Sequence, residues 1–307
     1  MTPEAPPRAI ACTGYLAVPG FELELRTELD EVVSEHGRLL LASGGPRPAA
    51  WAANIWHDPV PIHIGSIAEG AMALRNLQRN WAPYSFHLHR RTQLIHAKLP
   101  HVSAKPLMVP APVPAAPLGS WTLLDEHTIL AAARCSSPFP NGEVAFIENK
   151  QAPPNRAYLK LWEAFTLAGR RPGPGELCLD LGASPGGWSW VLQTLGARVI
   201  SVDKAPLAPA VAKLDGIEFR PMSAFALDPG QIEPVDWLFS DIVCYPARLL
   251  KLIERWLVSG GIRNFVCNIK FQGETDHAIA RRFAAIPRSR LMHLHHNKHE
   301  LTWIRLG

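Results

Sequence analysis

The sequence has few of the features that mark secreted, membrane-spanning or metal-binding proteins. Its five cysteines are scattered and form no C-x-x-C pair, so neither a disulfide framework nor a zinc or redox motif is indicated. No stretch approaches the roughly 18 consecutive apolar residues of a membrane span. The opening MTPEAPPRAIACTGYLAVPGF lacks a basic segment followed by a long apolar run. We therefore expect a cytoplasmic protein with reduced thiols, no metal and no membrane association.

The length of 307 residues favours two domains, and the proline distribution indicates where they divide. Prolines are densest in residues 104–121, which cannot form a continuous helix or a central strand, and a second group precedes residue 155. Before residue 145, helical spacing in 19–33 and strand patterns in 59–65 and 120–135 predict a small α+β module. We expect domains at 1–145 and 146–307.

After residue 155 the pattern alternates regularly between strands and helices. A helix is predicted at 156–169, with Asn155 as N-cap, and strands are predicted at 176–181, 198–203, 217–222, 235–242 and 264–270. Helical patterns at 186–196, 246–260 and 275–286 separate them, and two terminal strands follow. Alternation of this kind predicts an α/β fold of the Rossmann type, with a mostly parallel sheet covered by helices on both faces.

The segment ELCLDLGASPGGWSW, residues 176–190, is a buried strand that breaks into a glycine-rich turn before a helix. Ligands of doubly wound sheets bind beyond the carboxyl ends of the strands, where glycines let the backbone approach closely. The turn lacks the G-x-G-x-x-G spacing of dinucleotide sites, and Asp180 would repel a pyrophosphate. A ligand with an amine suits it better, and Asp203, 23 positions further on, supplies an acid for ribose hydroxyls.

These features together predict S-adenosyl-L-methionine as cofactor, because it combines an amine, a carboxylate and ribose hydroxyls. Trp188 is compatible with either a core position or a cofactor contact, whereas Trp190 is expected in the core. The residues that we expect at the cofactor are Asp180, Gly182, Ser184, Pro185, Gly186, Gly187, Trp188, Asp203, Ser223 and Asp241.

Four ionisable residues interrupt elements that are otherwise apolar. Lys160 lies in the helix RAYLKLWEAF, Asp241 and Lys270 end predicted strands, and Glu300 begins the last strand. Each of them singly is explained as well by a surface ion pair. Together they can converge at the carboxyl edge of the sheet, beside the predicted cofactor.

Four segments resemble the motifs of FtsJ-type RNA ribose 2′-O-methyltransferases: NRAYLKLWEAF, DLGASPGGWSWVL, VDWLFSDIV and FVCNIKFQGETD. The resemblance covers residues 150–307 and implies a catalytic Lys160, Asp241, Lys270 and Glu300. YLAVPGFELELRTEL and SSPFPNG are similar to the RlmM branch, which methylates a cytidine ribose in 23S ribosomal RNA. A full THUMP domain does not fit before the proline-rich segment, so we expect a reduced RNA-recognition module. Ser223 replaces an acid that contacts the adenine in related enzymes, and main-chain atoms of Ser223 and Ala224 can substitute for it.

The resemblance implies that Lys270 receives or steers the 2′-hydroxyl proton, that Asp241 and Glu300 position it, and that Lys160 orients the hydroxyl. RNA, 23S rRNA or its precursor, is the expected partner, and a monomer is favoured. A methyltransferase for another RNA, one for a small hydroxylated molecule and a non-catalytic RNA-binding relative remain alternatives. Trp81, Tyr84 and Phe86 are expected to stack unpaired bases among flanking arginines. The arginines expected to contact RNA are Arg75, Arg79, Arg90, Arg91, Arg281, Arg282, Arg288 and Arg290.

Overall fold

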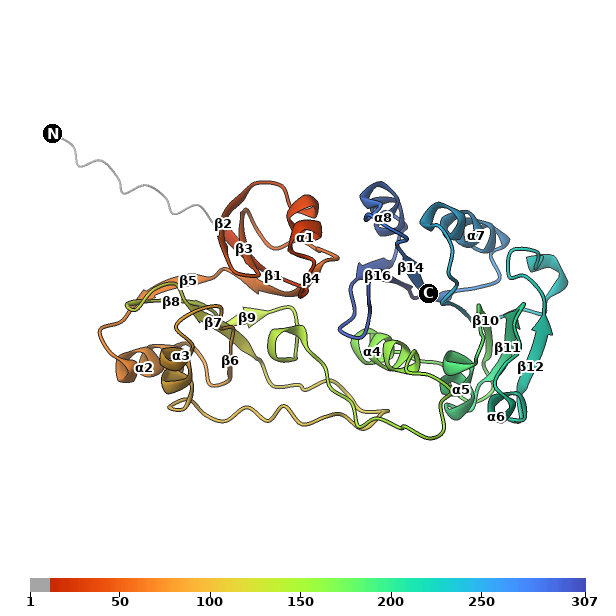
Figure 1. Ribbon diagram of the computed structural model, residues 1–307, viewed down its shortest axis with the longest axis horizontal. Coiled ribbons are helices and arrows are strands. Elements are labelled where there is room, and N and C mark those ends of the chain that lie inside the picture. The colour runs from red at the N-terminus through yellow and green to blue at the C-terminus, as the bar shows by residue number, and fades with distance from the viewer. Residues whose placement is uncertain (1–11) are drawn as a thin grey trace. The chain divides into compact units, whose positions relative to one another are not determined.

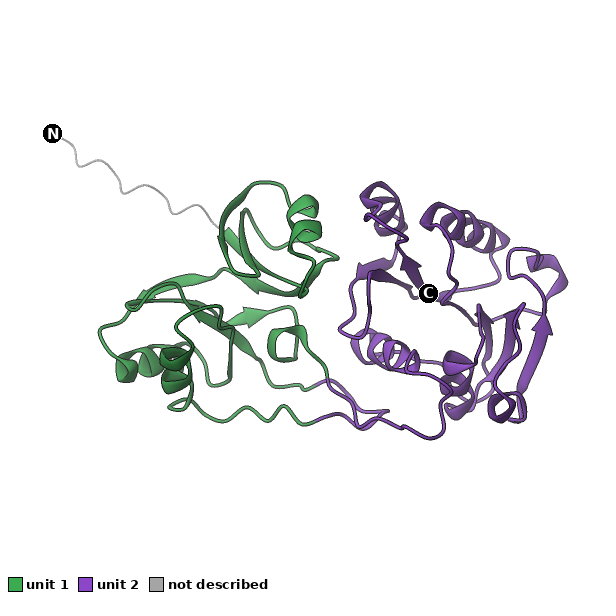
Figure 2. Cartoon of the chain, in the orientation of Figure 1, with its two compact units in different colours: residues 1–105, 114–144 green, residues 106–113, 145–307 purple. Residues whose placement is uncertain are grey.

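The computed structural model describes residues 12–307, which form two compact units (Figure 2). The N-terminal unit comprises residues 12–105 and 114–144 of the described chain, and the C-terminal unit comprises 106–113 and 145–307. Part of the proline-rich segment thus belongs to the second unit, where the main chain of Leu107 bonds to Ala145 and Ile147. Residues 1–11, which carry part of the expectation against secretion, lie outside the described residues. No helix in residues 12–307 is long and apolar enough to span a membrane.

The N-terminal unit is mostly β-structure, in two sheets. The first has the order β2-β3-β1-β4-β9, and the second has the order β5-β8-β7-β6. Their strands are β1 (Cys12–Ala17), β2 (Val32–His36), β3 (Leu39–Ser43), β4 (Ala52–His57), β5 (Val60–His63), β6 (Trp81–Pro83), β7 (Gly119–Leu123), β8 (Thr128–Ala132) and β9 (Arg134–Cys135). The helices are α1 (Glu22–Glu28), α2 (Ile67–Leu77), α3 (His89–His96) and the short 3₁₀ helix η1 (Pro140–Gly142).

Large apolar side chains from both sheets build the core of this unit. Trp81, Trp121 and Ile129 pack with α2 and α3 in one cluster, and Trp56 and Leu16 belong to a second. Helical spacing over 19–33 is realised only as far as Glu28, because the chain enters β2 at Val32, which pairs with Ala42 of β3. The predicted α+β character is therefore confirmed, with the sheets dominant.

The doubly wound sheet predicted for the C-terminal unit is confirmed. Its seven strands have the order β12-β11-β10-β13-β14-β16-β15, in which β16 alone runs opposite to the other strands. The strands are β10 (Leu177–Leu181), β11 (Arg198–Asp203), β12 (Ile217–Pro221), β13 (Trp237–Ser240), β14 (Asn264–Lys270), β15 (Ser289–Met292) and β16 (Glu300–Arg305).

Helices cover both faces of this sheet, with α4 and α5 on one face and α7 and α8 on the other (Figure 1). The helices are α4 (Tyr158–Ala168), α5 (Gly187–Thr194), the short α6 (Pro209–Ala212), α7 (Pro246–Ser259) and α8 (His277–Ala284), with the 3₁₀ helix η2 (Pro229–Gln231). Every residue of β10 is buried, as expected for a central strand packed on two sides.

The boundaries of α4 follow from its sequence at one end only. Gly169 ends the helix at φ 65°, a left-handed conformation that glycine adopts without strain. The prediction of Asn155 as N-cap is wrong, because Ala157 occupies that position and α4 begins at Tyr158. Asn155 still accepts a hydrogen bond from the Ala157 amide (3.1 Å), so it stabilises the turn that precedes the helix.

Candidate active site

The four ionisable residues singled out in the sequence lie together at the carboxyl edge of the parallel strands. Lys270 Nζ donates to the main-chain oxygen of Asp241 (2.6 Å) and lies 3.0 Å from its Oδ1. Lys160 Nζ lies 2.5 Å from Glu300 Oε1 and 3.8 Å from Asp241 Oδ1. Two lysine amino groups and two carboxyl groups therefore form one continuous network.

Sheet topology explains why residues so distant in sequence meet. Asp241 follows β13 and Lys270 ends β14, and these neighbouring parallel strands finish at the same edge. Glu300 begins β16, which runs antiparallel to β14 and pairs Glu300 with Lys270 in register. Lys160 comes from the first turn of α4, which packs on one face of the sheet.

The network is shielded from water, and Glu300 is its most deeply buried member. Its side chain is 4% exposed, against 14% for Lys160, 16% for Asp241 and 19% for Lys270. A carboxylate buried to this extent is costly unless a cation and hydrogen bonds compensate it. Lys160 supplies the cation and the Lys298 amide approaches the same oxygen at 3.3 Å. Lys160, Asp241 and Lys270 keep some exposure and are the members that a substrate can reach.

Beneath the four charges lies a neutral layer that the sequence prediction missed. Asn268 Nδ2 donates to Asp241 Oδ1 (2.8 Å), and Thr302 Oγ1 donates to Asn268 Oδ1 (2.6 Å). Asn297 Nδ2 donates in turn to Thr302 Oγ1 (3.0 Å). A usable signal was present, because Asn268 interrupts an apolar strand two residues before Lys270 and so shares its face. This series of side-chain hydrogen bonds fixes the orientation of the Asp241 carboxylate.

A second missed residue, Glu163, joins α4 to the loop before β16. Its carboxylate accepts hydrogen bonds from the amides of His295 (2.7 Å) and His296 (3.0 Å) and from His296 Nδ1 (2.7 Å). Glu163 is 2% exposed and lies one helical turn beyond Lys160. These hydrogen bonds fix the position of the helix that carries Lys160 relative to the loop that leads to Glu300. The histidines of residues 293–299 therefore lie in the loop between β15 and β16.

The glycine-rich turn after β10 is fixed by hydrogen bonds to the neighbouring strand and loop. The Gly182 amide donates to the Val202 carbonyl (2.9 Å), and Ser184 Oγ donates to the Pro206 carbonyl (2.8 Å). Asp203 accepts from the amides of Ser184 (3.1 Å) and Ala205 (2.9 Å). Each carboxylate oxygen of Asp203 has a second lone pair, so it can still accept hydrogen bonds from ligand hydroxyls.

Glycine is required at two points of this turn. Gly182 has φ 80°, and a Cβ there would lie 2.7 Å from Ile242 Cγ1. A Cβ on Gly187 would lie 2.2 Å from Asn155 Oδ1. The turn is therefore packed between the loop after Asp241 and the segment before α4. Trp188 is in the core, 3% exposed, and its Nε1 donates to the Ala157 carbonyl (2.9 Å), which ties α5 to α4.

Asp180 lies beneath the turn, fully buried. Ser189 Oγ donates to its Oδ2 (2.6 Å), while Oδ1 has no hydrogen-bond partner within residues 12–307. Burial raises the pKa of Asp180 from its ordinary 3.8 to about 7, and the hydrogen bond from Ser189 opposes part of that rise. An orphaned buried carboxylate oxygen is suited to a donor supplied by a ligand or a bound water.

A cavity of about 240 Å³ opens beside the turn. Of the residues expected at the cofactor, Gly182, Asp203 and Ser223 line it, and Asp241 directly precedes the lining residue Ile242. The sequence prediction missed Phe225 and Arg248, whose guanidinium lies 3.8 Å from the centre of the Phe225 ring and forms one wall with it. Acidic, glycine and aromatic groups around one cavity fit S-adenosyl-L-methionine, with Asp203 as an acceptor, whereas Asp180 is buried beneath the turn and does not line the cavity.

The stacking residues expected in the N-terminal unit are not all available. Trp81 is fully buried and donates through Nε1 to the carbonyls of Leu74 and Gln78, and Tyr84 is 5% exposed with its hydroxyl bonded to the Arg38 amide. The expectation that these two rings stack on RNA bases is therefore wrong, because both belong to the core. Phe86 is half-buried and stacks on His87.

Comparison with known proteins agrees with this geometry. Residues 153–293 match the family model of FtsJ-like methyltransferases, and this range contains Lys160, Asp241 and Lys270. The C-terminal unit is an FtsJ-like methyltransferase domain. Domains of this family depend on S-adenosyl-L-methionine, which the residues around the cavity fit. Glu300 lies outside the matched range, and its contact with Lys160 connects it to the FtsJ-like domain.

Two relatives carry the name ribosomal RNA large subunit methyltransferase M. The protein of Halorhodospira halophila is 41% identical over 120 residues, which are 38% of this chain and 35% of that protein. The protein of Thauera aminoaromatica is 26% identical over an alignment that covers 98% of this chain and 98% of that protein. The alignments thus span about a third of the first relative and nearly all of the second.

Among solved structures, an N1-methyltransferase from Burkholderia thailandensis with bound S-adenosylhomocysteine superposes with a TM-score of 0.36. It is 18% identical and covers 50% of this chain and 79% of its own. The assignment to FtsJ-like methyltransferases therefore depends on the sequence match and on the site geometry.

Proposed function

We propose that this chain transfers a methyl group from S-adenosyl-L-methionine to a ribose 2′-hydroxyl of RNA, and that the RNA is 23S ribosomal RNA or its precursor. The observation that carries the proposal is the contact network of Lys160, Asp241, Lys270 and Glu300 beside the cofactor turn. A 2′-hydroxyl is a weak nucleophile, so its methylation needs alignment and removal of one proton. The network contains groups for both tasks.

Lys270 is the residue that we assign to the proton. Its Nζ is held by two Asp241 oxygens at 2.6 and 3.0 Å, which fixes the direction of its remaining valences. Lys160, held by Glu300, orients the hydroxyl. The cofactor supplies a methyl group bonded to a positively charged sulfur. That sulfur is a good leaving group because it departs as a neutral thioether. With the cofactor bound, the 2′-oxygen would form the new bond to the methyl carbon and the carbon–sulfur electron pair would stay on sulfur, while Lys270, as the neutral amine, would take up the 2′-hydroxyl proton.

Cofactor binding is assigned to the turn and to the cavity. Asp203 accepts from the ribose hydroxyls, and the main chain of Ser223 contacts the adenine. The helix start at Gly186 and Gly187 offers amides to the carboxylate, while Asp180 Oδ1 accepts from the amine directly or through water. Ser184, Pro185 and Trp188 hold the turn in place.

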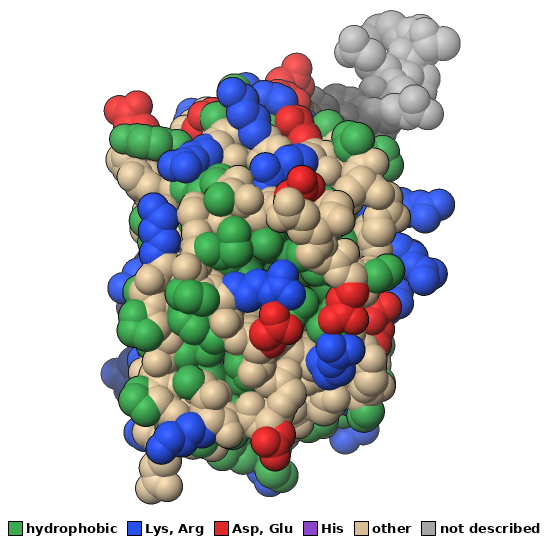
Figure 3. All heavy atoms as spheres, turned by 90° about the vertical axis from the view of Figure 1, so that its right-hand side faces the viewer, with side chains coloured by type: hydrophobic (Ala, Val, Ile, Leu, Met, Phe, Trp, Pro, Cys, Tyr) green, Lys and Arg blue, Asp and Glu red, His purple; other side chains and the backbone are tan. Residues whose placement is uncertain are grey.

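RNA as the substrate is supported by the names of the relatives and by the presence of the N-terminal unit. The related proteins are called large subunit ribosomal RNA methyltransferases. On the face shown in Figure 3, Lys and Arg are interspersed with Asp and Glu, so that face has no continuous basic surface. We assign RNA recognition to the N-terminal unit, where Arg75, Arg79 and Arg90 are exposed on or near α2 and α3. We also propose that the protein acts in the cytoplasm as a monomer.

The proposal is tested by incubating the chain with labelled cofactor and total RNA from cells that lack the enzyme. Label is expected in alkali-resistant dinucleotides, because a methylated 2′-oxygen cannot attack the adjacent phosphate. Label in base-methylated mononucleotides, or none in RNA and some in small molecules, would contradict it. The Lys270→Ala chain serves as the negative control.

A further inference from the structure

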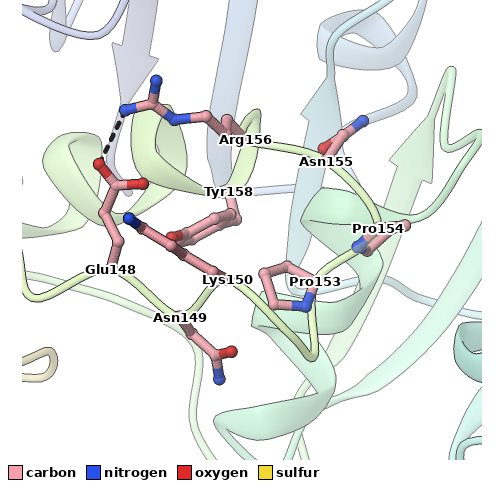
Figure 4. A pocket seen from close by; sticks show the side chains of 8 residues that line it. All are labelled: Glu148, Asn149, Lys150, Pro153, Pro154, Asn155, Arg156 and Tyr158. Carbon is pink, nitrogen blue, oxygen red and sulfur yellow. Dashed lines mark hydrogen bonds and ion pairs between the residues drawn. The ribbon is translucent and has the colours of Figure 1, made fainter.

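The segment that leads into α4 encloses a cavity to which the proposed methyl transfer assigns no role. Its volume is about 480 Å³, in the range of small-ligand pockets. Figure 4 shows that its walls come from one stretch of chain, with Glu148, Asn149 and Lys150 on one side and Asn155, Arg156 and Tyr158 on the other. All of these residues belong to the C-terminal unit.

The charges around the cavity favour an anion. Arg156 Nη2 lies 2.8 Å from Glu148 Oε1, and the arginine side chain is 74% exposed, which leaves donors free beyond the one directed at Glu148. Lys150 is exposed and has no ion-pair partner among the described residues. Two cations and one anion therefore line the cavity, with the Lys150 charge uncompensated.

A buried hydroxyl forms part of the cavity wall. Tyr158 is 1% exposed, and its hydroxyl lies beside the Asn149 main chain without completing a hydrogen bond to it. Burial raises the pKa of Tyr158 above its ordinary value, and the negative charge of Glu148 adds to the rise. The hydroxyl thus stays protonated at neutral pH, available to an acceptor on a ligand.

The cavity lies at the end of α4 that carries Lys160. Tyr158 and Lys160 both lie in the first turn of α4, although side chains two residues apart point to different faces of the helix. On the other side, Asn155 packs against Gly187 in the cofactor turn. A nucleotide bound in this cavity would therefore neighbour the nucleotide whose ribose reaches Lys270.

We propose that this cavity binds one nucleotide of single-stranded RNA next to the methylated nucleotide, with its phosphate on Lys150 and Arg156 and its base or ribose hydrogen-bonded to Tyr158. The proposal rests on the proposed RNA methyltransferase function. Phosphate contacts of this kind hold the strand in register without reading its sequence. The cavity would then fix which ribose along the strand meets the catalytic lysines.

The test uses the full chain and a 23S ribosomal RNA transcript. Lys150→Gln is expected to raise the KM for RNA about tenfold, with kcat and cofactor affinity unchanged. The slope of log Kd for RNA against log salt concentration should fall by roughly one, because one phosphate contact is lost. The matched control is Lys251→Gln, an exposed lysine on α7, which should leave the slope unchanged.

Tyr158→Phe provides a second variant that keeps the buried ring. It is expected to leave the salt slope unchanged and to raise the KM for RNA a few-fold. A Lys150→Gln chain with the affinity and salt slope of the unsubstituted protein would overturn the subsite while leaving the proposed function standing. Failure of the unsubstituted protein to bind RNA would overturn both.

Discussion

Among residues 12–307, the buried polar side chains of the N-terminal unit are hydroxyls and one amide, whereas those of the C-terminal unit include three carboxyl groups. The first group consists of Thr13, Asn54, Thr92, Ser120 and Thr122, and the carboxylates of the second are Glu163, Asp180 and Glu300. Neutral groups satisfy one another cheaply, as Asn54 and Ser120 do at 3.2 Å. Buried charges require dedicated partners and contribute little net stability, so their concentration in one unit marks where the chemistry lies.

The architecture of the two units produces this difference. In the C-terminal unit, parallel strands end at one edge, where polar residues distant in sequence can meet. In the N-terminal unit, a sheet that is antiparallel except for the pairing of β6 with β7 packs with α2 and α3 around aromatic rings such as Trp81 and Trp121. An interleaving of arginines and aromatic residues in the sequence can therefore indicate a core as readily as a nucleic-acid surface.

The contrast between the two units is tested most severely by the Lys270→Ala variant. We expect kcat for RNA methylation to fall at least about 1000-fold, because the proton acceptor is removed, while cofactor affinity stays within about twofold. Single-turnover assays and calorimetric titration of the cofactor measure the two quantities. Lys251→Ala is the control for loss of a lysine in the same unit. Retained turnover in Lys270→Ala would reject the role of this residue.

Removal of a buried charge in one unit can be set against removal of a buried amide in the other. Glu163→Gln leaves the amides of His295 and His296 with a weaker acceptor, so kcat should fall about 10- to 100-fold with little change in KM. Asn54→Ala should lower the free energy of unfolding by about 1–3 kcal/mol and leave kcat unchanged. Thermal unfolding and steady-state kinetics separate the two effects. Equal losses of kcat would remove the distinction between the units.

The buried carboxylate of Asp180 should give the C-terminal unit a pH dependence that neutral groups cannot produce. Because the pKa of Asp180 is raised to about 7, the folded chain holds a proton that the unfolded chain releases above pH 3.8. The stability contributed by Asp180 therefore falls as pH rises from about 4 to about 7. Relative to the unsubstituted protein, Asp180→Asn should gain stability over this interval. Parallel pH profiles of unfolding for the two proteins would contradict the raised pKa.

The smallest effect is expected on the surface of the N-terminal unit. Arg90 and Arg91 lie on α3, and Arg90 is exposed. Charge reversal of both residues should weaken RNA binding about tenfold and leave cofactor affinity unchanged, because only exposed phosphate contacts are lost. Filter binding at two salt concentrations measures the change. Unchanged RNA affinity would remove α3 from the RNA-binding surface.

Local sequence patterns were informative where side-chain periodicity and turn residues agree. β10, the glycine turn and α5 were predictable because an apolar strand, glycines and an amphipathic helix follow one another. Lys270 stood out because a charge ended a buried strand. Asn268 and Glu163 were missed because their partners, Thr302 and His296, lie 34 and 133 positions away.

The sequence by itself determined the alternation of strands and helices, the glycine turn, and the four ionisable residues that interrupt apolar elements. Each of these is a short-range property of the chain, set by periodicity, backbone freedom and hydrophobicity. Only the tertiary structure decided which carboxylate holds which lysine, that Trp81 and Tyr84 are core residues, and that Glu163 fixes the loop before Glu300. Those outcomes depend on packing between segments distant in sequence, and no local pattern specifies which segments will meet.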